Sequence, residues 1–153
     1  MKIQNMILKT FMASVLAILI LGGGSAMAQS QESVTNSCSL SNIAGSYAFT
    51  ASGSLSPSTY TPFAAVGVLN IDSNGAASGS DTANALGVAV ARTFTGTITV
   101  NSDCTGTVNL NFVGAPFDGL AVANLVFEDS RKGMRGIQLL PVGPVITLSA
   151  RRK

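Results

Sequence analysis

The segments 93–100 and 104–112 each alternate between one set of side chains that is largely apolar and one that is polar. A period of two places alternate side chains on opposite faces of a β-strand, so each segment predicts a strand with one buried face. Between them lies Asn101-Ser102-Asp103, and Asn and Asp both favour tight turns. The sequence therefore predicts an antiparallel hairpin. Its buried face would carry Phe94, Gly96, Ile98 and Val100 on one arm, and Val108, Leu110 and Phe112 on the other.

The rest of the chain after residue 37 also reads as short strands separated by turns. Asn74-Gly75, between 63–73 and 76–82, is the strongest short hairpin signal. The segment 86–90 predicts either a strand of its own or the start of the next one. Pro141 and Pro144 would keep the last connection out of the sheet. The remaining predicted strands are 46–54, 120–127, 136–140 and 145–150.

These segments define the expected fold class. The run 120–127 is almost continuously apolar, which is typical of a strand that is covered on both faces. No convincing amphipathic helix is visible. About eight strands with short connections predict an all-β antiparallel barrel, with a two-layer β-sandwich as the alternative. Closure into a barrel would remove edge strands, which a chain with few charged side chains protects poorly.

The N-terminal segment has the pattern of a secretory signal. Lys2 and Lys9 precede the apolar stretch 12–21, and Ala26-Met27-Ala28 has the small-x-small pattern of a cleavage site. A membrane anchor would need roughly 20 apolar residues. The expected organisation is a cleaved signal helix over 1–28, a flexible leader over 29–37 and one barrel domain over 38–153. The protein is expected to be exported, either to the periplasm or to the medium.

Loss of the signal changes the charge of the chain. Removal of 28 from 153 residues leaves 125, which carry seven acidic and seven basic side chains. A neutral domain has no electrostatic footprint for nucleic acid, and the basic end Arg151-Arg152-Lys153 is expected to be solvated. No integral membrane span is expected after cleavage. An outer-membrane barrel would need aromatic girdles, for which the chain has too few aromatic residues. The oligomeric state is left open.

Cys38 and Cys104 are the two cysteines of the chain. In an oxidising compartment two thiols of a small domain usually pair. A reactive thiol would need a base that lowers its pKa, and the sequence contains no histidine. A structural disulfide between Cys38 and Cys104 is therefore predicted.

The sequence offers little catalytic chemistry. Without histidine, no Ser-His-Asp triad and no mixed His/Cys zinc site can form, and no cofactor motif is recognisable. Neither catalytic nor metal-binding residues are assigned, and ligand-binding residues remain unknown. The acidic residues of 72–75, 103 and 128–129 are interpreted as turn residues. Asp81 and Asp118 are the carboxylates to inspect for an enzymatic role, and Tyr60 is expected in an exposed loop.

Three stretches, 38–53, 67–79 and 96–107, carry a resemblance. They contain a Gly-x-Tyr-x-Phe opening strand, a glycine-rich first hairpin and the turn Asp103-Cys104-Thr105-Gly106-Thr107. In these features the chain resembles a group of uncharacterised secreted bacterial proteins. Their architecture is similar to calycin-like barrels of the lipocalin and allene oxide cyclase type. The resemblance implies a fold rather than an activity, and no cyclase residue can be transferred to this chain.

Three functions follow as hypotheses. The favoured one is a non-catalytic exported barrel that binds a small hydrophobic ligand, since an eight-stranded barrel can just hold one. Small residues that would leave room for a ligand are Ala64, Ala65, Gly67, Ala121 and Ala123. The alternatives are a cyclase- or isomerase-like barrel enzyme that uses a carboxylate, and a structural or interaction protein of the cell envelope.

Overall fold

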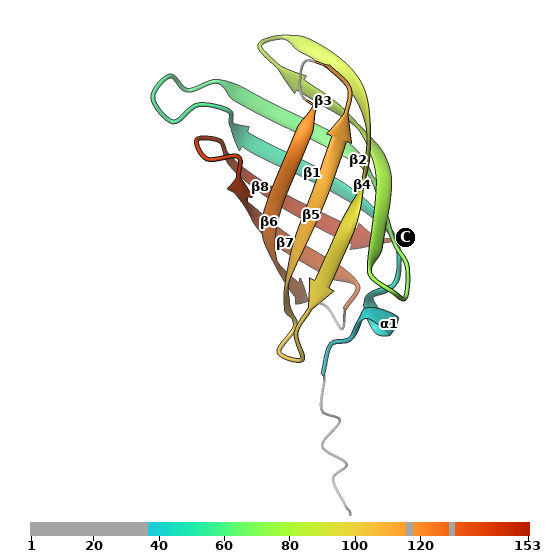
Figure 1. Ribbon diagram of the computed structural model, residues 1–153. Coiled ribbons are helices and arrows are strands. Elements are labelled where there is room, and N and C mark those ends of the chain that lie inside the picture. The colour runs from blue at the N-terminus through green and yellow to red at the C-terminus, as the bar shows by residue number, and fades with distance from the viewer. Residues whose placement is uncertain (1–36, 116–117, 129–130) are drawn as a thin grey trace, which may run out of the picture. The chain divides into compact units, whose positions relative to one another are not determined.

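The chain forms a closed antiparallel barrel in which every strand pairs with its neighbours in sequence (Figure 1). The structure is a computed structural model, and it describes residues 37–115, 118–128 and 131–153. β8 pairs with β1 and closes the sheet, so the barrel is confirmed over the sandwich. The eight strands are β1 (Gly45–Ser54), β2 (Pro62–Ile71), β3 (Ala76–Ala85), β4 (Val88–Val100), β5 (Thr105–Val113), β6 (Gly119–Glu128), β7 (Gly133–Leu140) and β8 (Val145–Arg152).

The predicted central hairpin is confirmed, and its first arm is longer than expected. β4 and β5 pair with Ile98 opposite Val108 and Phe94 opposite Phe112. Residues 88–90 of the segment 86–90 begin the same strand as 93–100, β4, so the second of the two alternatives for that segment is confirmed. Leu86 and Gly87 form the turn before it, both with positive φ. Two such residues are the requirement of a tight two-residue hairpin turn.

Two of the turns predicted from the sequence are stabilised by the side chain of an aspartate. Asp72 Oδ1 accepts hydrogen bonds from the backbone N–H groups of Asn74 (2.9 Å) and Ala76 (2.8 Å). Asp103 Oδ1 accepts from the N–H of Thr105 at 3.0 Å and from its hydroxyl at 2.7 Å. The hydrogen bonds from Thr105 lower the pKa of Asp103. Both carboxylates therefore act as turn formers.

The outer face of β6 differs from the expectation. Ala123, Leu125 and Phe127 point inward and are buried, whereas Val126, between Leu125 and Phe127, is exposed on the outside, and Val122, before Ala123, is half-buried. The continuous apolar run over 120–127 thus does not mean that both faces are covered. It combines an inward face with an outer surface that carries apolar side chains.

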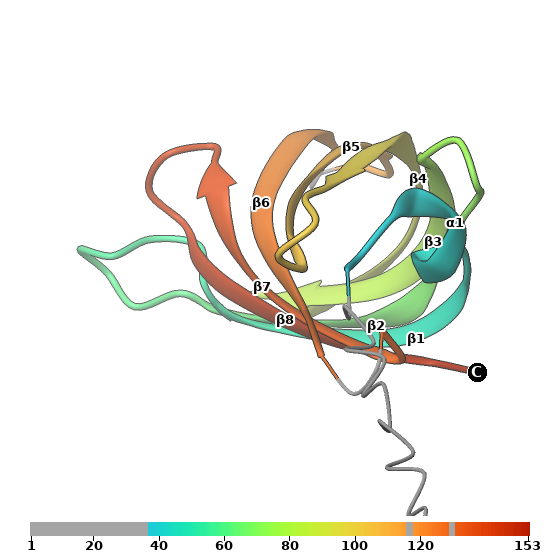
Figure 2. The same ribbon diagram turned by 90° about the horizontal axis from the view of Figure 1, so that it is seen from below.

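A short helix, α1 (Leu40–Ile43), lies at one end of the barrel, where no helix was expected (Figure 2). Ile43 is fully buried, and the Tyr47 hydroxyl donates a 2.6 Å hydrogen bond to its carbonyl oxygen. The predicted disulfide between Cys38 and Cys104 is formed, with the two Cα atoms 4.9 Å apart. It joins the segment before α1 to the β4–β5 turn, so this end of the barrel is closed. We call it the closed end.

The predicted signal over 1–28 and all but the last residue of the predicted leader over 29–37 lie outside the described residues. The boundary of the barrel domain at residue 38 stays a prediction. Within the described residues, no helix is long and apolar enough to cross a membrane.

Candidate functional site

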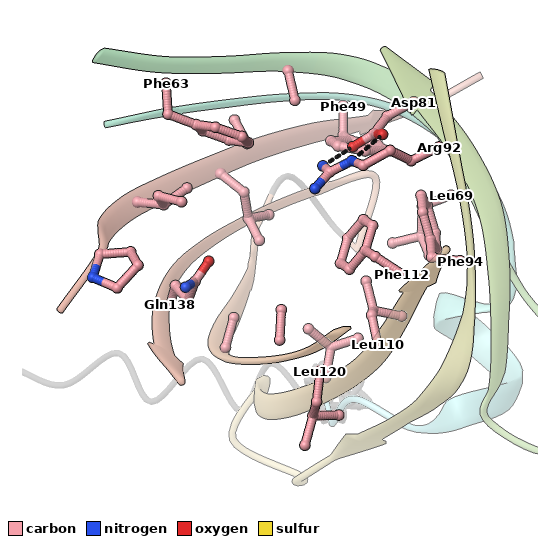
Figure 3. Close-up of a pocket in the computed structure, with 18 of the residues that line it drawn as sticks. Phe49, Phe63, Leu69, Asp81, Arg92, Phe94, Leu110, Phe112, Leu120 and Gln138 are labelled. Atoms are coloured by element: carbon pink, nitrogen blue, oxygen red, sulfur yellow. Dashed lines mark hydrogen bonds and ion pairs between the residues drawn. The ribbon is translucent and has the colours of Figure 1, made fainter. Parts of the chain in front are cut away.

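The barrel encloses a cavity of about 260 Å³ that is lined almost entirely by apolar side chains (Figure 3). It begins above the buried cluster at the closed end, where Leu125 and Met134 form part of its wall. It extends to Leu55, Pro141 and Pro144, which belong to connections at the opposite end. We call that end the open end. For comparison, an apolar cavity of about 150 Å³ can hold benzene, and small-molecule pockets usually measure about 300–1,000 Å³.

Small inward residues provide part of this space. Ala65 on β2 and the pair Ala121 and Ala123 on β6 line the cavity, as the sequence analysis expected. Ala64 does not, because it points outward and is exposed. Gly67 was expected to line the same space. It lies instead in the wall opposite Asp81 and does not border the cavity.

Three phenylalanines pack together in the cavity wall. Phe94 on β4 contacts Phe112 on β5, with ring centroids 5.0 Å apart, and Phe49 on β1, with centroids 5.9 Å apart. Gly79 of β3 lies directly opposite Phe94, and a Cβ atom there would lie 2.5 Å from the Phe94 ring. The glycine therefore makes the space that this aromatic group occupies.

An ion pair lies inside this apolar interior. Asp81 on β3 and Arg92 on β4 are direct cross-strand partners, and their side chains are 1% and 8% exposed. The guanidinium donates from Nε to Asp81 Oδ1 at 3.0 Å and from Nη2 to Oδ2 at 2.6 Å. Its central carbon lies 4.3 Å from the centroid of the Phe112 ring. The arrangement combines a bidentate guanidinium–carboxylate ion pair with a cation–π contact.

Asp118 and Gln138 are the other polar side chains among the described residues that line the cavity. Asp118 lines it next to the open end and is exposed. Gln138 on β7 is half-buried, and its amide lies across the cavity from the ion pair (Figure 3). Of the two carboxylates singled out in the sequence, Asp81 is thus inside the barrel and Asp118 at its entrance. They are not brought together as a catalytic pair.

Sequence reasoning missed Arg92 and Gln138 as cavity residues. Arg92 stands two positions before Phe94 on the same strand, and that spacing places both side chains on the inward face. This signal was available, but a charged residue is not expected there. Gln138 is four positions after the buried Met134 on β7. This even spacing likewise places both side chains on the inward face.

Other residues considered in the sequence lie away from the cavity. Tyr60 is exposed in the β1–β2 connection, as expected. Glu128 pairs with Arg135 across the β6–β7 hairpin, with Nε and Oε1 2.5 Å apart. Over residues 37–115, 118–128 and 131–153, no cluster of three or more His, Cys, Asp or Glu side chains is suited to hold a metal ion.

The open end carries a rim of exposed apolar side chains. Leu86 in the β3–β4 turn is 77% exposed, and Val142 between β7 and β8 is 86% exposed. In an up-and-down barrel, alternate connections lie at the same end, so these turns surround the entrance to the cavity. Further exposed members of the rim are Tyr60, Val88, Leu120, Leu140 and Val145.

Comparison with known proteins identifies an architecture and no family. No protein-family model and no curated protein matches the chain. Among solved structures, the chain is similar to a redesigned β-barrel, mFAP1, which was solved bound to DFHBI. The match covers 74% of this chain and 98% of that chain, with a TM-score of 0.51 and 13% sequence identity. At this identity, the likeness shows the fold alone.

Proposed function

We propose that this protein binds a small, largely apolar molecule inside the barrel. The observation that carries the proposal is the hollow apolar interior, because small barrels are otherwise filled by their own side chains. Concave apolar sites with a few convergent polar groups are the usual form of a small-molecule site. The redesigned barrel with a similar fold was solved with a small ligand bound. The calycin-like architecture that the sequence resembles supports the same function.

The proposed place of action is outside the cytoplasm. The Cys38–Cys104 disulfide is consistent with an oxidising compartment. Together with the N-terminal signal pattern, it supports export to the periplasm or the medium. The apolar rim would give an apolar ligand a path into the cavity along apolar side chains.

The two alternative functions receive less support. A cyclase- or isomerase-like enzyme would use a buried carboxylate, and Asp81 is buried; both its oxygens, however, already accept hydrogen bonds from Arg92. A purely structural or interaction protein is favoured by exposed apolar residues at the open end. It gives no reason for a cavity of about 260 Å³.

The test is binding of Nile red, an uncharged apolar dye, to the protein without its signal segment. Its fluorescence should rise on binding, and competing apolar compounds should raise the melting temperature, because a ligand that binds only the native state stabilises it. The proposed function fails if neither the dye nor any compound in a panel of hydrophobic metabolites binds.

A matched pair of variants locates the site. Ala121→Phe fills the cavity from β6, whereas Val126→Phe adds the same ring to the outer face of the same strand. The first should lose at least tenfold in dye affinity and the second should bind like the wild type. Equal losses in both would place the dye outside the barrel.

A further inference from the structure

The charges in the cavity wall restrict the ligand that the cavity can hold. Among the described residues that line it, three are charged: Asp81, Arg92 and Asp118. Asp81 and Arg92 form a two-pronged ion pair that is almost fully buried. The pair therefore adds no net charge to the interior, and Asp118 at the entrance leaves one negative charge in excess.

A negatively charged ligand finds no cation without a counter-charge among the described residues of this wall. The guanidinium of Arg92 is the one positive charge among the described lining residues, and the Asp81 carboxylate is hydrogen-bonded to it at 2.6 and 3.0 Å. A ligand carboxylate that approached Arg92 would also approach Asp81, and like charges at close range in a low-dielectric interior repel strongly. Burial of a charge without its own partner is unfavourable.

A ligand cation is also poorly served. Asp81 is already neutralised by Arg92, and Asp118 lies in the exposed part of the wall, where water weakens its attraction. A buried cationic group would therefore lose its hydration without gaining a buried counter-charge.

Neutral hydrogen-bonding groups fit the wall better. The Gln138 amide faces the cavity and forms no hydrogen bond with any other residue that the structure describes. An amide both donates and accepts, so it can pair with a hydroxyl or a carbonyl group. Phe49, Phe63 and Phe112 supply apolar contact in the same cavity.

We infer that the ligand is an uncharged apolar molecule with a neutral polar group, such as a hydroxyl or a carbonyl. The cavity discriminates against the carboxylate of the same carbon skeleton. This inference rests on the proposed function and adds to it the ligand class. The Asp81–Arg92 pair is the specificity determinant, because Asp81 neutralises the cation that, among the described lining residues, would otherwise attract an anion.

The test compares 1-octanol with octanoate at pH 8, in competition with Nile red. Octanol should displace the dye with at least a tenfold lower dissociation constant than octanoate. Equal or tighter binding of octanoate overturns the inference and leaves the proposed function standing. If the dye does not bind at all, the proposed function itself has failed.

Asp81→Asn tests the role of the pair directly. The variant removes the negative charge and keeps the shape of the side chain, so Asp81 no longer neutralises the guanidinium of Arg92. The ratio of octanoate to octanol affinity should rise at least tenfold over the wild type. Asp72→Asn, the same substitution in a turn at the closed end, should leave the ratio unchanged.

An unchanged ratio in folded Asp81→Asn overturns the role of Asp81. If that variant does not fold, the wild-type comparison of octanol with octanoate alone decides the inference.

Discussion

Gly67 lies directly opposite Asp81 in the β2–β3 ladder, and the absence of a side chain there makes room for the buried carboxylate. A Cβ atom at Gly67 would lie 2.6 Å from Asp81 Cβ and 2.3 Å from the carbonyl oxygen of Ser80. Both neighbours belong to the wall of a closed barrel, so neither can move away without disturbing the ladder. The position of the ion pair thus depends on a glycine one strand away.

Gly67→Ala should therefore destabilise the protein, although alanine usually lowers the entropy of the unfolded chain and stabilises a strand. The expected loss is about 1–3 kcal/mol in the free energy of unfolding, as for other overpacked sites. Urea denaturation would measure it. Ser80→Ala, at an exposed position next to Asp81, is the control and should change stability by less than about 0.5 kcal/mol. A stabilised Gly67→Ala variant would contradict the close approach.

Reduction of the disulfide should lower stability substantially. Cys38 and Cys104 are 66 residues apart in sequence, and the entropy of closing such a loop in the unfolded chain corresponds to about 4 kcal/mol. The comparison is urea denaturation of the wild type with and without dithiothreitol. A Cys38→Ser/Cys104→Ser variant should match the reduced wild type and should not respond to the reductant. A wild type equally stable in both conditions would contradict the prediction.

The Tyr47 hydroxyl links the closed end to the barrel. It donates to the Ile43 carbonyl at 2.6 Å and lies 3.3 Å from the Arg131 carbonyl. Tyr47→Phe leaves the ring in place and removes the donor, so the buried Ile43 carbonyl loses a partner. We expect a loss of about 1–3 kcal/mol. Tyr60→Phe, at an exposed position, provides the matched control and should not change the midpoint of unfolding.

The same tyrosine predicts an alkaline transition. Burial raises the pKa of Tyr47 above its usual value of 10.0, and the Arg152 guanidinium offsets part of that rise. The folded state therefore holds the phenolic proton more tightly than the unfolded state. This contribution to stability is fully present below about pH 10 and is lost as pH rises through the raised pKa. Stability measured from pH 8 to 11 should fall more steeply in the wild type than in Tyr47→Phe; parallel curves would refute it.

The fold was largely predictable because most strands alternate, and the exceptions have a physical cause. The start of β4 is only one of two alternatives for the segment 86–90, because the charged Arg92 at an inward position interrupts the apolar alternation. In β6 the outward residues Val122 and Val126 are apolar, so the alternation that marks a half-exposed strand is absent. The helix α1 has four residues, too few for a helical period to show in the sequence.

The cavity was only partly predictable, because it depends on register. Ala64 and Ala65 are neighbouring residues of the same type. Strand pairing decides which of them faces the interior of the barrel. The cross-strand partners Asp81 and Arg92 follow once the turn is placed at Leu86 and Gly87, since Ala85 then pairs with Val88. Two residues with positive φ, one of them leucine, are an unusual turn. No local signal therefore placed the turn there.

The buried pair should be more costly to break than to replace. Arg92→Met leaves the Asp81 carboxylate buried without the guanidinium, and removal of one partner of a buried pair typically costs about 3–5 kcal/mol. Asp81→Leu combined with Arg92→Met removes both charges and fills the space with apolar atoms. Such replacements are often neutral or stabilising, so the double variant should recover most of the loss in urea denaturation. The single variant Asp81→Leu completes the comparison. If the loss of stability in the double variant equals the sum of the losses in the two single variants, the two side chains do not act as a pair.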